Sequence, residues 1–295
     1  MLKKICPICD SDTKSEKVYD ENLPSKLEKV NYSGRKKPDG YHYEMVRCKD
    51  CSLLYASSIY ESKITDKLYE ESDFPYEQEI EGLKKTYGNC LKYAENLISK
   101  KENFLEIGCG NGFLLEVAID QGWKNVTGVE PSIKAVNQAK SNIRKKIVHS
   151  IFKSDSFKKN NYDVVFFAMI LEHVPDVNKF LSEIFKVLNP GGVVIGICHD
   201  ERHFLSKLLK DKHPIINDEH NYVFGKKTAK KILLKNNFKD IKVNSLKNYY
   251  SANYWFDMAP IPEIIKKPFK LISKIFFGDK NIGIKAGNIF LVGKK

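Results

Sequence analysis

Four of the seven cysteines form two Cys-x-x-Cys pairs, Cys6 with Cys9 and Cys48 with Cys51. Each pair can present two thiolates from one tight turn, and four thiolates complete the tetrahedral coordination that Zn²⁺ adopts in structural sites. The opening residues carry no apolar signal region, which favours metal binding over disulfides. We therefore expect one structural zinc ion on these four side chains, with no coordination position left for a catalytic water.

A glycine-rich turn occupies residues 108–112, between a predicted strand and a predicted helix. Open α/β sheets bind ligands beyond the carboxyl ends of their strands, where such a turn would lie. Glycine there allows positive φ and a close approach of the backbone to a ligand. The dinucleotide fingerprint needs a third glycine where Phe113 stands, so the sequence lacks the geometry for a pyrophosphate. The turn indicates a nucleoside site of another kind.

Two acidic side chains lie near the ends of successive predicted strands, Glu106 before the glycine turn and Glu130 at the end of the next strand. A carboxylate at the tip of the second strand can accept hydrogen bonds from both hydroxyls of a ribose. Dinucleotide-binding proteins also place an acid near this point. Glu130 therefore supports a nucleoside ligand without choosing between cofactors.

Three histidines lie beyond predicted strands, at the edge of the sheet where a ligand would bind. His173 follows the fourth strand, His199 follows the fifth, and His220 lies on the loop that leads to the next helix. Because imidazole titrates near physiological pH, each could act as a general base toward an acceptor. A hydrogen-bonded structural histidine is the competing interpretation for each of them.

Three motifs in order along the chain resemble those of class I S-adenosylmethionine-dependent methyltransferases. The run Leu-Glu-Ile-Gly-Cys-Gly-Asn-Gly at 105–112 is similar to the family's Glu/Asp-x-Gly-x-Gly-x-Gly motif. The segment 163–176 looks like the family's fourth strand with the turn after it, and Leu-Asn-Pro-Gly-Gly at 188–192 looks like the turn before the fifth strand. The resemblance covers the region between these motifs well and weakens through the C-terminal third.

The resemblance implies S-adenosylmethionine as the cofactor and assigns residues to it. Glu106 would lie near the methionine ammonium and Glu130 on the ribose. Ile151 and Phe152, near the end of the third strand, would lie beside the adenine. The other cofactor-binding residues that it implies are Gly108, Cys109, Gly110, Gly112 and Met169.

The segment after the fourth strand constrains the acceptor. The Asn-Pro-Pro-Tyr or Asp-Pro-Pro-Tyr motif of amino-methylating enzymes is absent, and Glu-His-Val-Pro at 172–175 stands in its place, as in small-molecule and sugar methyltransferases. The cysteine-rich N-terminus also resembles methyltransferases that act on sugars in polysaccharide pathways. We therefore expect methyl transfer to a small molecule, foremost a hydroxyl of a sugar or polysaccharide precursor. Two alternatives stay open: an RNA methyltransferase recruited by the zinc module, and a non-enzymatic cofactor-binding regulator.

The elements that must position these residues alternate between strands and helices from residue 103 onward, which predicts βαβ units and a parallel sheet. The resemblance adds that the fold is α/β and Rossmann-like, with a mainly parallel seven-stranded sheet and an antiparallel final strand. Predicted strands cover 104–107, 126–130, 147–152, 162–168, 193–198, 241–246 and 288–292, and predicted helices cover 113–121, 133–143, 177–188 and 228–236.

The chain divides into three predicted parts. Residues 1–60 form a small zinc-binding module, residues 61–100 a helical linker that docks on the core, and residues 101–295 the methyltransferase domain. Within the last part, residues 249–287 are long for a simple connection and predict a C-terminal lid or substrate segment. Its aromatic side chains, which include Tyr254 and Trp255, could stack on a sugar or form the lid's own core.

The net charge of +12 raises the question of a polyanionic partner. Only four of the 49 basic side chains are arginine, and the lysines are spread along the chain, so a solvated surface is favoured over a nucleic-acid face. Residues 264–277 are basic and amphipathic; docking on the protein itself is favoured there over peripheral membrane contact. No apolar run reaches the ~18 residues of a membrane span, and the expected location is cytoplasmic. The oligomeric state is left open.

Overall fold

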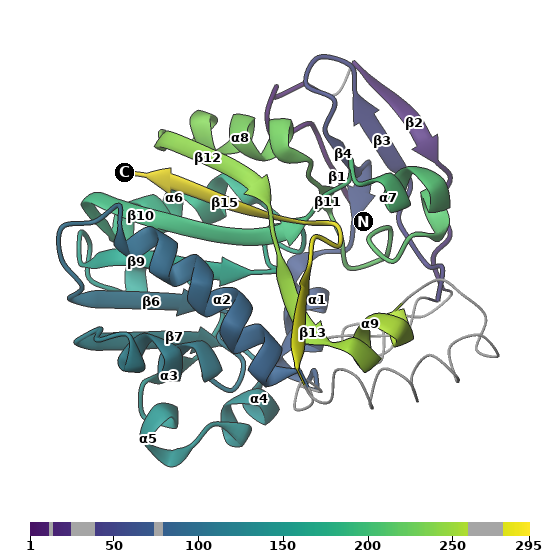
Figure 1. Ribbon diagram of the computed structural model, residues 1–295. Coiled ribbons are helices and arrows are strands. Elements are labelled where there is room, and N and C mark those ends of the chain that lie inside the picture. The colour runs from purple at the N-terminus through teal and green to yellow at the C-terminus, as the bar shows by residue number, and fades with distance from the viewer. Residues whose placement is uncertain (12–13, 25–38, 74–78, 259–279) are drawn as a thin grey trace.

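The largest sheet has seven strands in the order β12-β15-β10-β9-β6-β7-β8, with helices on both faces (Figure 1). The computed structural model describes residues 1–11, 14–24, 39–73, 79–258 and 280–295. Neighbouring strands from β10 to β8 run parallel, whereas β15 is antiparallel to both β10 and β12, which confirms the expected fold class. The strands are β6 (Asn103–Ile107), β7 (Asn125–Glu130), β8 (Ile147–His149), β9 (Tyr162–Ala168), β10 (Leu188–His199), β12 (Lys239–Ser245) and β15 (Asn288–Lys294).

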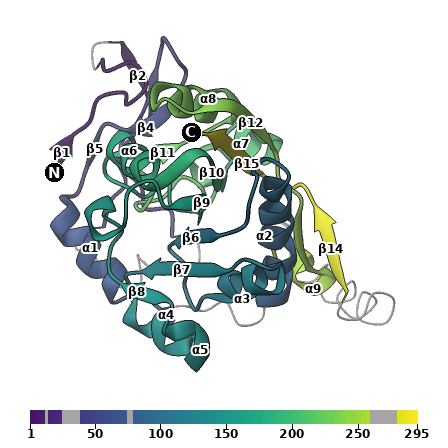
Figure 2. The same cartoon turned by 90° about the vertical axis from the view of Figure 1, so that its left-hand side faces the viewer.

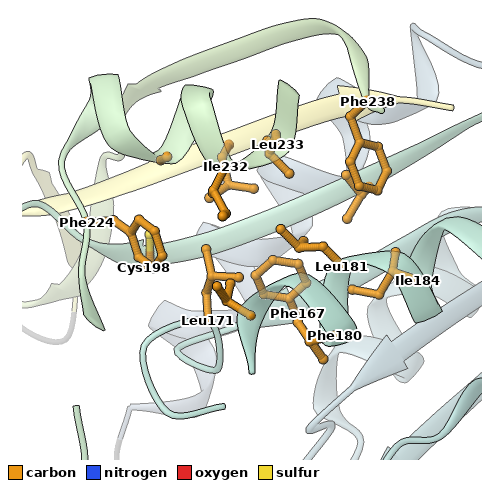
Figure 3. Packing of buried hydrophobic residues seen from close by; sticks show 14 of the residues in the cluster. Phe167, Leu171, Phe180, Leu181, Ile184, Cys198, Phe224, Ile232, Leu233 and Phe238 are labelled. Carbon is orange, nitrogen blue, oxygen red and sulfur yellow. The ribbon is translucent and has the colours of Figure 1, made fainter. Parts of the chain in front are cut away.

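Side chains of the central strands alternate between two hydrophobic cores, one on each face of the sheet. In β9, Val165 and Phe167 enter one core while Val164 and Phe166 enter the other. Strands buried on both faces are typical of parallel sheets that helices cover on both sides. Figure 3 shows the first core, in which Phe167 packs among side chains of two helices. These helices are α6 (Val177–Val187) and α8 (Lys226–Lys235), and the other face is covered by α2 (Ile80–Glu95), α3 (Phe113–Asp120) and α5 (Ser141–Arg144).

The strand order reverses at β6, which has β7 on one side and β9 on the other. In open α/β sheets, ligands bind beyond the carboxyl ends of the strands at such a reversal. The glycine turn follows β6, and the segment that carries Glu172 and His173 follows β9. The topology therefore brings both predicted halves of the site to one edge of the sheet.

Two predicted elements differ from the structure. The helix predicted at 133–143 is split into α4 (Ile133–Gln138) and α5, because Ala139 and Lys140 have extended backbone angles with ψ of 143° and 147°. The third strand ends at His149 rather than at residue 152. This strand, β8, lies at the edge of the sheet, so only one neighbour supplies hydrogen bonds to extend it.

The N-terminal residues form a second sheet in the order β11-β4-β3-β2, next to a short pair of β1 and β5. Strand β11 comes from the C-terminal half of the chain and pairs with β4 through Tyr222 opposite Tyr55. Leu53 and Tyr55 also share a hydrophobic core with Tyr222 and α6. This sheet and this core therefore both contain residues from either side of the predicted boundary at residue 60. These strands are β1 (Leu2–Lys3), β2 (Ser15–Tyr19), β3 (Met45–Cys48), β4 (Leu54–Ala56), β5 (Ser58–Ile59) and β11 (Tyr222–Val223).

A hairpin of β13 and β14, with the helix α9, lies beside α2 in the region predicted as a lid (Figure 2). Tyr249 N donates to Thr86 Oγ1 on α2 (2.9 Å), which ties the hairpin to that helix. Residues 259–279, which include the basic segment 264–277, lie outside the described residues. Within the described ranges, no helix has the length and apolarity to span a bilayer. The elements not yet given are α1 (Ser62–Glu70), α7 (Phe204–Leu209), β13 (Asn248–Ser251), α9 (Ala252–Met258) and β14 (Asn281–Ile284), with 3-10 turns at Ser154–Ser156 and Lys210–Lys212.

Gly82 on α2 is expected to be intolerant of a side chain. A Cβ there would lie 2.1 Å from Tyr249 O and 3.3 Å from Tyr250 Cα, both main-chain atoms of β13. Alanine in place of glycine in an exposed helix stabilises by about 1 kcal/mol, but this clash should make Gly82→Ala destabilising by about 1–3 kcal/mol. The control is Gly88→Ala on the same helix, where the Cβ meets a movable side-chain atom, Val117 Cγ1, at 3.0 Å. Thermal unfolding measures the stability of both variants. A Gly82→Ala variant as stable as Gly88→Ala would contradict the packing argument.

Candidate functional site

The glycine turn has the backbone conformation that its sequence indicates. Gly108, Gly110 and Gly112 have φ of +69°, +55° and +74°, where other residues are strained. A Cβ on Gly108 would lie 2.4 Å from Ile170 Cδ1, in the segment after β9. Gly108 N donates to Val129 O on β7 (2.8 Å). The turn is therefore fixed against its neighbours and offers bare backbone at the edge of the sheet.

Glu106, the penultimate residue of β6, has a buried carboxyl group with unused hydrogen-bonding capacity. Its side chain is 3% exposed, and Oε2 has no hydrogen-bond partner among the described residues. Burial raises its pKa well above the usual value, and the negative charge of Glu130 raises it further. A buried carboxylate oxygen without a donor is costly unless a ligand supplies one. The site therefore fits a ligand that carries a cationic donor such as an ammonium.

Glu130, the last residue of β7, connects the glycine turn to the start of α4. Its Oε2 accepts from Gly110 N and its Oε1 from Ser132 N, both at 2.8 Å. Burial raises the pKa of this carboxyl, and the two backbone donors act in the opposite direction. Each oxygen can accept one more hydrogen bond, so a ribose is compatible with these contacts. The ribose role of Glu130 stays a prediction.

The residues predicted to contact the rest of the cofactor have different environments. Met169 follows β9 directly, is half-buried and has a positive φ of +54°. Phe152 is 8% exposed and packs against Phe157 and Phe180, with ring centroids 5.5 and 6.3 Å apart. Its ring is therefore engaged in the core, while the neighbouring Ile151 is half-buried. The adenine contacts of Ile151 and Phe152 stay predictions.

The three predicted histidines lie together, although they are far apart in the sequence. The ring centroid of His220 is 4.7 Å from that of His173 and 5.4 Å from that of His199. They come from the turn after β9, the end of β10 and the loop before β11. Tyr69 on α1 joins them, with its hydroxyl 2.9 Å from His173 Nδ1, and Glu219 Oε2 lies 3.6 Å from the same nitrogen. We call these three imidazoles the histidine cluster; with Tyr69 and Glu219 they form a set of groups that can transfer protons.

Hydrogen bonds orient two of these imidazole rings. His220 Nδ1 lies 2.8 Å from Ile215 O, a carbonyl that can only accept, so in the neutral ring Nδ1 carries the proton and Nε2 the lone pair. His199 Nδ1 lies 3.1 Å from Asn288 Oδ1. Burial lowers the pKa of His199 to about 4, so this ring is neutral at neutral pH. His220 therefore has the tautomer in which Nε2 can accept a proton.

Glu172 forms hydrogen bonds with the backbone beside the histidine cluster. Its Oε1 accepts from His199 N (3.0 Å), and its main-chain oxygen accepts from Asn221 N (2.7 Å), directly after His220. Its Oε2 is buried and has no hydrogen-bond partner among the described residues. One glutamate thus fixes the backbone beside two of the three histidines.

Glu172 also gives the stability of the protein a measurable pH dependence. Burial raises its pKa to about 7 from an ordinary value of 4.5. The folded state then binds the proton more tightly than the unfolded chain, so this stabilisation is fully present below the unfolded pKa and is lost as pH rises through about 7. In Glu172→Gln, the unfolding free energy should fall less between about pH 5 and 8, by roughly 2–3 kcal/mol. Urea unfolding across this range tests it, with the partly exposed Glu102→Gln as control; an unchanged pH slope would contradict the shift.

The four predicted metal ligands converge. The sulfur atoms of Cys6, Cys9, Cys48 and Cys51 all lie within 4.8 Å of one another, and the sulfurs of Cys6 and Cys51 are 3.5 Å apart. Tetrahedral Zn–S bonds of ~2.3 Å place sulfur atoms about 3.8 Å apart. The donor set and its spacing therefore fit one Zn²⁺ ion.

The two Cys-x-x-Cys turns have the same backbone design. Asp10 N donates to Cys6 O (2.9 Å), and Ser52 N donates to Cys48 O (2.8 Å). Asp10 and Ser52 both have positive φ, +54° and +69°. The repeated conformation gives each turn two thiols on one side, as a four-thiolate metal site requires.

Comparison with known proteins places most of the site within one family. Residues 81–243 match the Methyltransferase domain family. A tRNA U34 carboxymethyltransferase of Nautilia profundicola is 30% identical over 118 residues, which cover 36% of this chain and 37% of the relative. A ubiquinone biosynthesis O-methyltransferase of a Bradyrhizobium species is 31% identical over 127 residues, which cover 39% of this chain and 50% of the relative. The matches thus span half or less of the length of these two curated relatives.

A solved structure extends the likeness to the fold. The crystal structure of a SAM-dependent methyltransferase from Archaeoglobus fulgidus aligns over 75% of this chain and 98% of that chain, with 16% identity and a TM-score of 0.51. At this identity the similarity concerns the fold alone. The glycine turn and the three histidines lie inside the range matched by the family, whereas the four cysteines precede it.

Proposed function

The chain belongs to the Methyltransferase domain family, and on that premise we propose that it transfers a methyl group from S-adenosylmethionine to a small-molecule acceptor. The observation that carries the proposal is the buried carboxyl of Glu106, whose Oε2 lacks a donor next to a turn of three glycines with positive φ. The ammonium of the cofactor's methionine part would supply that donor as a charge-assisted hydrogen bond. The dinucleotide alternative lacks this match, because nicotinamide cofactors carry no ammonium group.

The nucleoside part of the cofactor would lie along the ends of β6 and β7. Glu130 would offer its remaining lone pairs to the ribose hydroxyls, while the glycine turn allows the ligand to approach the backbone. When bound, S-adenosylmethionine supplies a methyl group on a positively charged sulfur, which is electrophilic without further activation. The protein then needs to orient the acceptor in line and, for a hydroxyl acceptor, remove its proton.

The histidine cluster is suited to remove that proton. Nε2 of His220 would take it while the acceptor oxygen bonds to the methyl carbon and the carbon–sulfur bond breaks, so that the sulfur leaves as a neutral thioether. The nearby His173, with Tyr69 on its Nδ1, offers a route by which the proton reaches solvent. His199 is held neutral by burial and lines the same cluster.

A hydroxyl of a sugar or a related precursor is the acceptor that we favour. Glu172 and His173 stand where amino-methylating enzymes carry a different motif, and the Bradyrhizobium relative is named an O-methyltransferase. In the lid, the ring of Tyr250 is 4.2 Å from Tyr254 and 5.3 Å from Trp255. These half-buried rings pack on one another and could still offer an apolar face to a sugar.

RNA is the second candidate acceptor, because a relative with 30% identity bears the name tRNA U34 carboxymethyltransferase. Formation of S-adenosylhomocysteine with a panel of sugar nucleotides and with transfer RNA distinguishes the two. RNA binding with a steep salt dependence would support the RNA acceptor, since phosphate contacts release counterions. Cofactor binding without turnover on any acceptor would instead support a regulatory protein.

The cysteines would hold a structural zinc ion. All four ligand positions are thiolates, so no position is left for a reacting water. Three of the four thiols are buried in the core that the module shares with the main domain. The metal would therefore stabilise the fold and take no part in methyl transfer.

The cofactor proposal is tested by calorimetry with S-adenosylmethionine. Glu130→Ala removes the ribose acceptor and should weaken binding by about 2–4 kcal/mol, or roughly 30- to 1000-fold. The control is Glu102→Ala, since Glu102 precedes β6 at the opposite edge of the sheet and pairs with Lys124 (2.7 Å). Both variants should first show the circular dichroism of the wild type. Unchanged affinity in the folded Glu130 variant would remove the ribose assignment.

A further inference from the structure

Asn221 connects the cysteine module to the histidine cluster. It follows His220 directly and precedes β11, the strand that pairs with β4 of the module. Its main-chain oxygen accepts from Ala56 N on β4 (2.9 Å), and its main-chain N donates to Glu172 O (2.7 Å). Its side-chain Nδ2 donates to His173 O (2.6 Å). One residue, 7% exposed, thus bonds to the module and to the segment that carries two of the site's side chains.

The cysteine turns determine where β4 lies. Cys48 ends β3, and its N donates to Leu53 O (2.9 Å), so the second cysteine turn folds β4 back along β3. The pairing of Val46 with Tyr55 continues this hairpin. Strand β4 then has β3 on one side and β11 on the other. The position of Asn221 therefore depends on a hairpin that two of the four thiolates close.

Further contacts join the module to the turn after β9. Tyr222 Oη donates to Pro175 O (3.0 Å), and Lys4 Nζ donates to the same oxygen (2.5 Å). Asn178 Nδ2 donates to Pro7 O (2.9 Å), inside the first cysteine turn. The module therefore contacts the chain at Pro175, near the end of this turn, and at Asn178, on the helix α6 that follows it. Hydrogen bonds that share partners in this way support one another and favour a single geometry.

We propose that Asn221 is a positioning residue for methyl transfer and that the metal-loaded cysteine module holds it in place. The inference rests on the proposed function and adds to it a role for the module within the reaction centre. Asn221 does not contact the acceptor in this scheme. It fixes the spacing between His220 and His173, and a base displaced by a fraction of an ångström transfers protons more slowly.

The first test compares Asn221→Ala with Asn189→Ala. Asn189 makes a comparable side-chain hydrogen bond, Nδ2 to Asp163 Oδ1 (2.7 Å), at the opposite edge of the sheet. In Asn221→Ala, the imidazole resonances of His173 and His220 should shift and turnover should fall about tenfold or more, with cofactor affinity within about twofold. Asn189→Ala should leave all three unchanged. Asn221→Asp keeps the shape of the side chain but cannot donate a hydrogen bond. If Asn221→Ala folds poorly, Asn221→Asp takes its place and should show the same shifts and the same loss of turnover.

The second test asks whether the metal acts through Asn221. Removing zinc from the wild type with a chelator should move the resonances of His173 and His220. In Asn221→Ala, the same treatment should move His173 by less, because its main link to the module is already lost. The proposal would be overturned if the histidine resonances did not change on metal removal. It would also be overturned if metal removal shifted His173 in Asn221→Ala by as much as in the wild type. Since these spectra need no acceptor, a chain that never turns over would refute the proposed function alone.

Discussion

Replacing His220 with alanine is expected to lower the rate of methyl transfer by about a hundredfold or more, because general-base catalysis contributes ~10² to 10⁴. His220 is the central member of the histidine cluster, 4.7 Å from His173 and 5.4 Å from His199 between ring centroids. Its Nδ1–H is committed to Ile215 O, which leaves Nε2 as the basic nitrogen. Affinity for S-adenosylmethionine should change little, since the glycine turn, Glu106 and Glu130 are unchanged in this variant. Single-turnover rates and calorimetry separate the two quantities.

The alanine variants of His173 and His199 extend this test to the whole cluster. His203→Ala serves as the control, because that imidazole packs on Phe204 at the start of α7 (4.8 Å between centroids). The control should retain wild-type turnover. Activity retained in all three cluster variants would defeat the histidine-base proposal and leave an acceptor that needs positioning alone.

Loss of the metal is the second change with a large expected effect. The protein should contain about one zinc ion per chain, and structural zinc contributes an apparent ~10–16 kcal/mol in zinc-finger peptides. Removing it, or changing Cys9 to serine, should lower the unfolding temperature sharply. Elemental analysis and thermal unfolding measure the two effects. Cys90→Ala, which alters a buried thiol of α2 outside the module, is the control and should keep its zinc.

The extent of that loss distinguishes the sequence-based expectation from the structure. Taken as a separate unit, the module would lose order mainly within residues 1–60. Because β11 completes its sheet, amide hydrogen exchange should also accelerate at Val223, which pairs with Leu54 of β4, while β6 and α3 stay protected. Protein purified without chelators that contains no zinc would contradict the metal assignment itself.

Local patterns were sufficient to predict the central part of the fold. The strands near 104–107 and 162–168 are buried on both faces, and such short apolar runs, the first of them followed by the glycine turn, are visible in the sequence. The sequence does not predict the break between α4 and α5, because the apolar spacing of Val136, Ala139 and Ile143 continues across it. Strand β8 is shorter than predicted, because the sequence does not reveal that this strand has only one neighbour in the sheet.

The candidate site was predictable where one short segment carries its chemistry. The glycine turn and the Cys-x-x-Cys pairs specify both residue type and backbone, so their positions follow from the sequence. Tyr69 and Asn221 had no such signal, because their roles arise from α1 and β11 packing against distant segments. Strand order is sufficient to place the histidines at the carboxyl ends of the strands. Their contact with one another depends on the same tertiary packing.

The pairing of β11 with β4 has a consequence for the order in which the protein is made. The cysteine turns and β4 are translated before the main sheet, whereas Tyr222, the partner of Tyr55, is translated only after most of that sheet. At ~5–20 residues per second, the outer edge of β4 would wait on the order of 10–30 s for its last strand. During that interval a nascent chain exposes an unpaired strand edge, the feature that natural proteins otherwise protect. Capture of zinc by the two cysteine turns would hold the hairpin of β3 and β4 in place until β11 arrives.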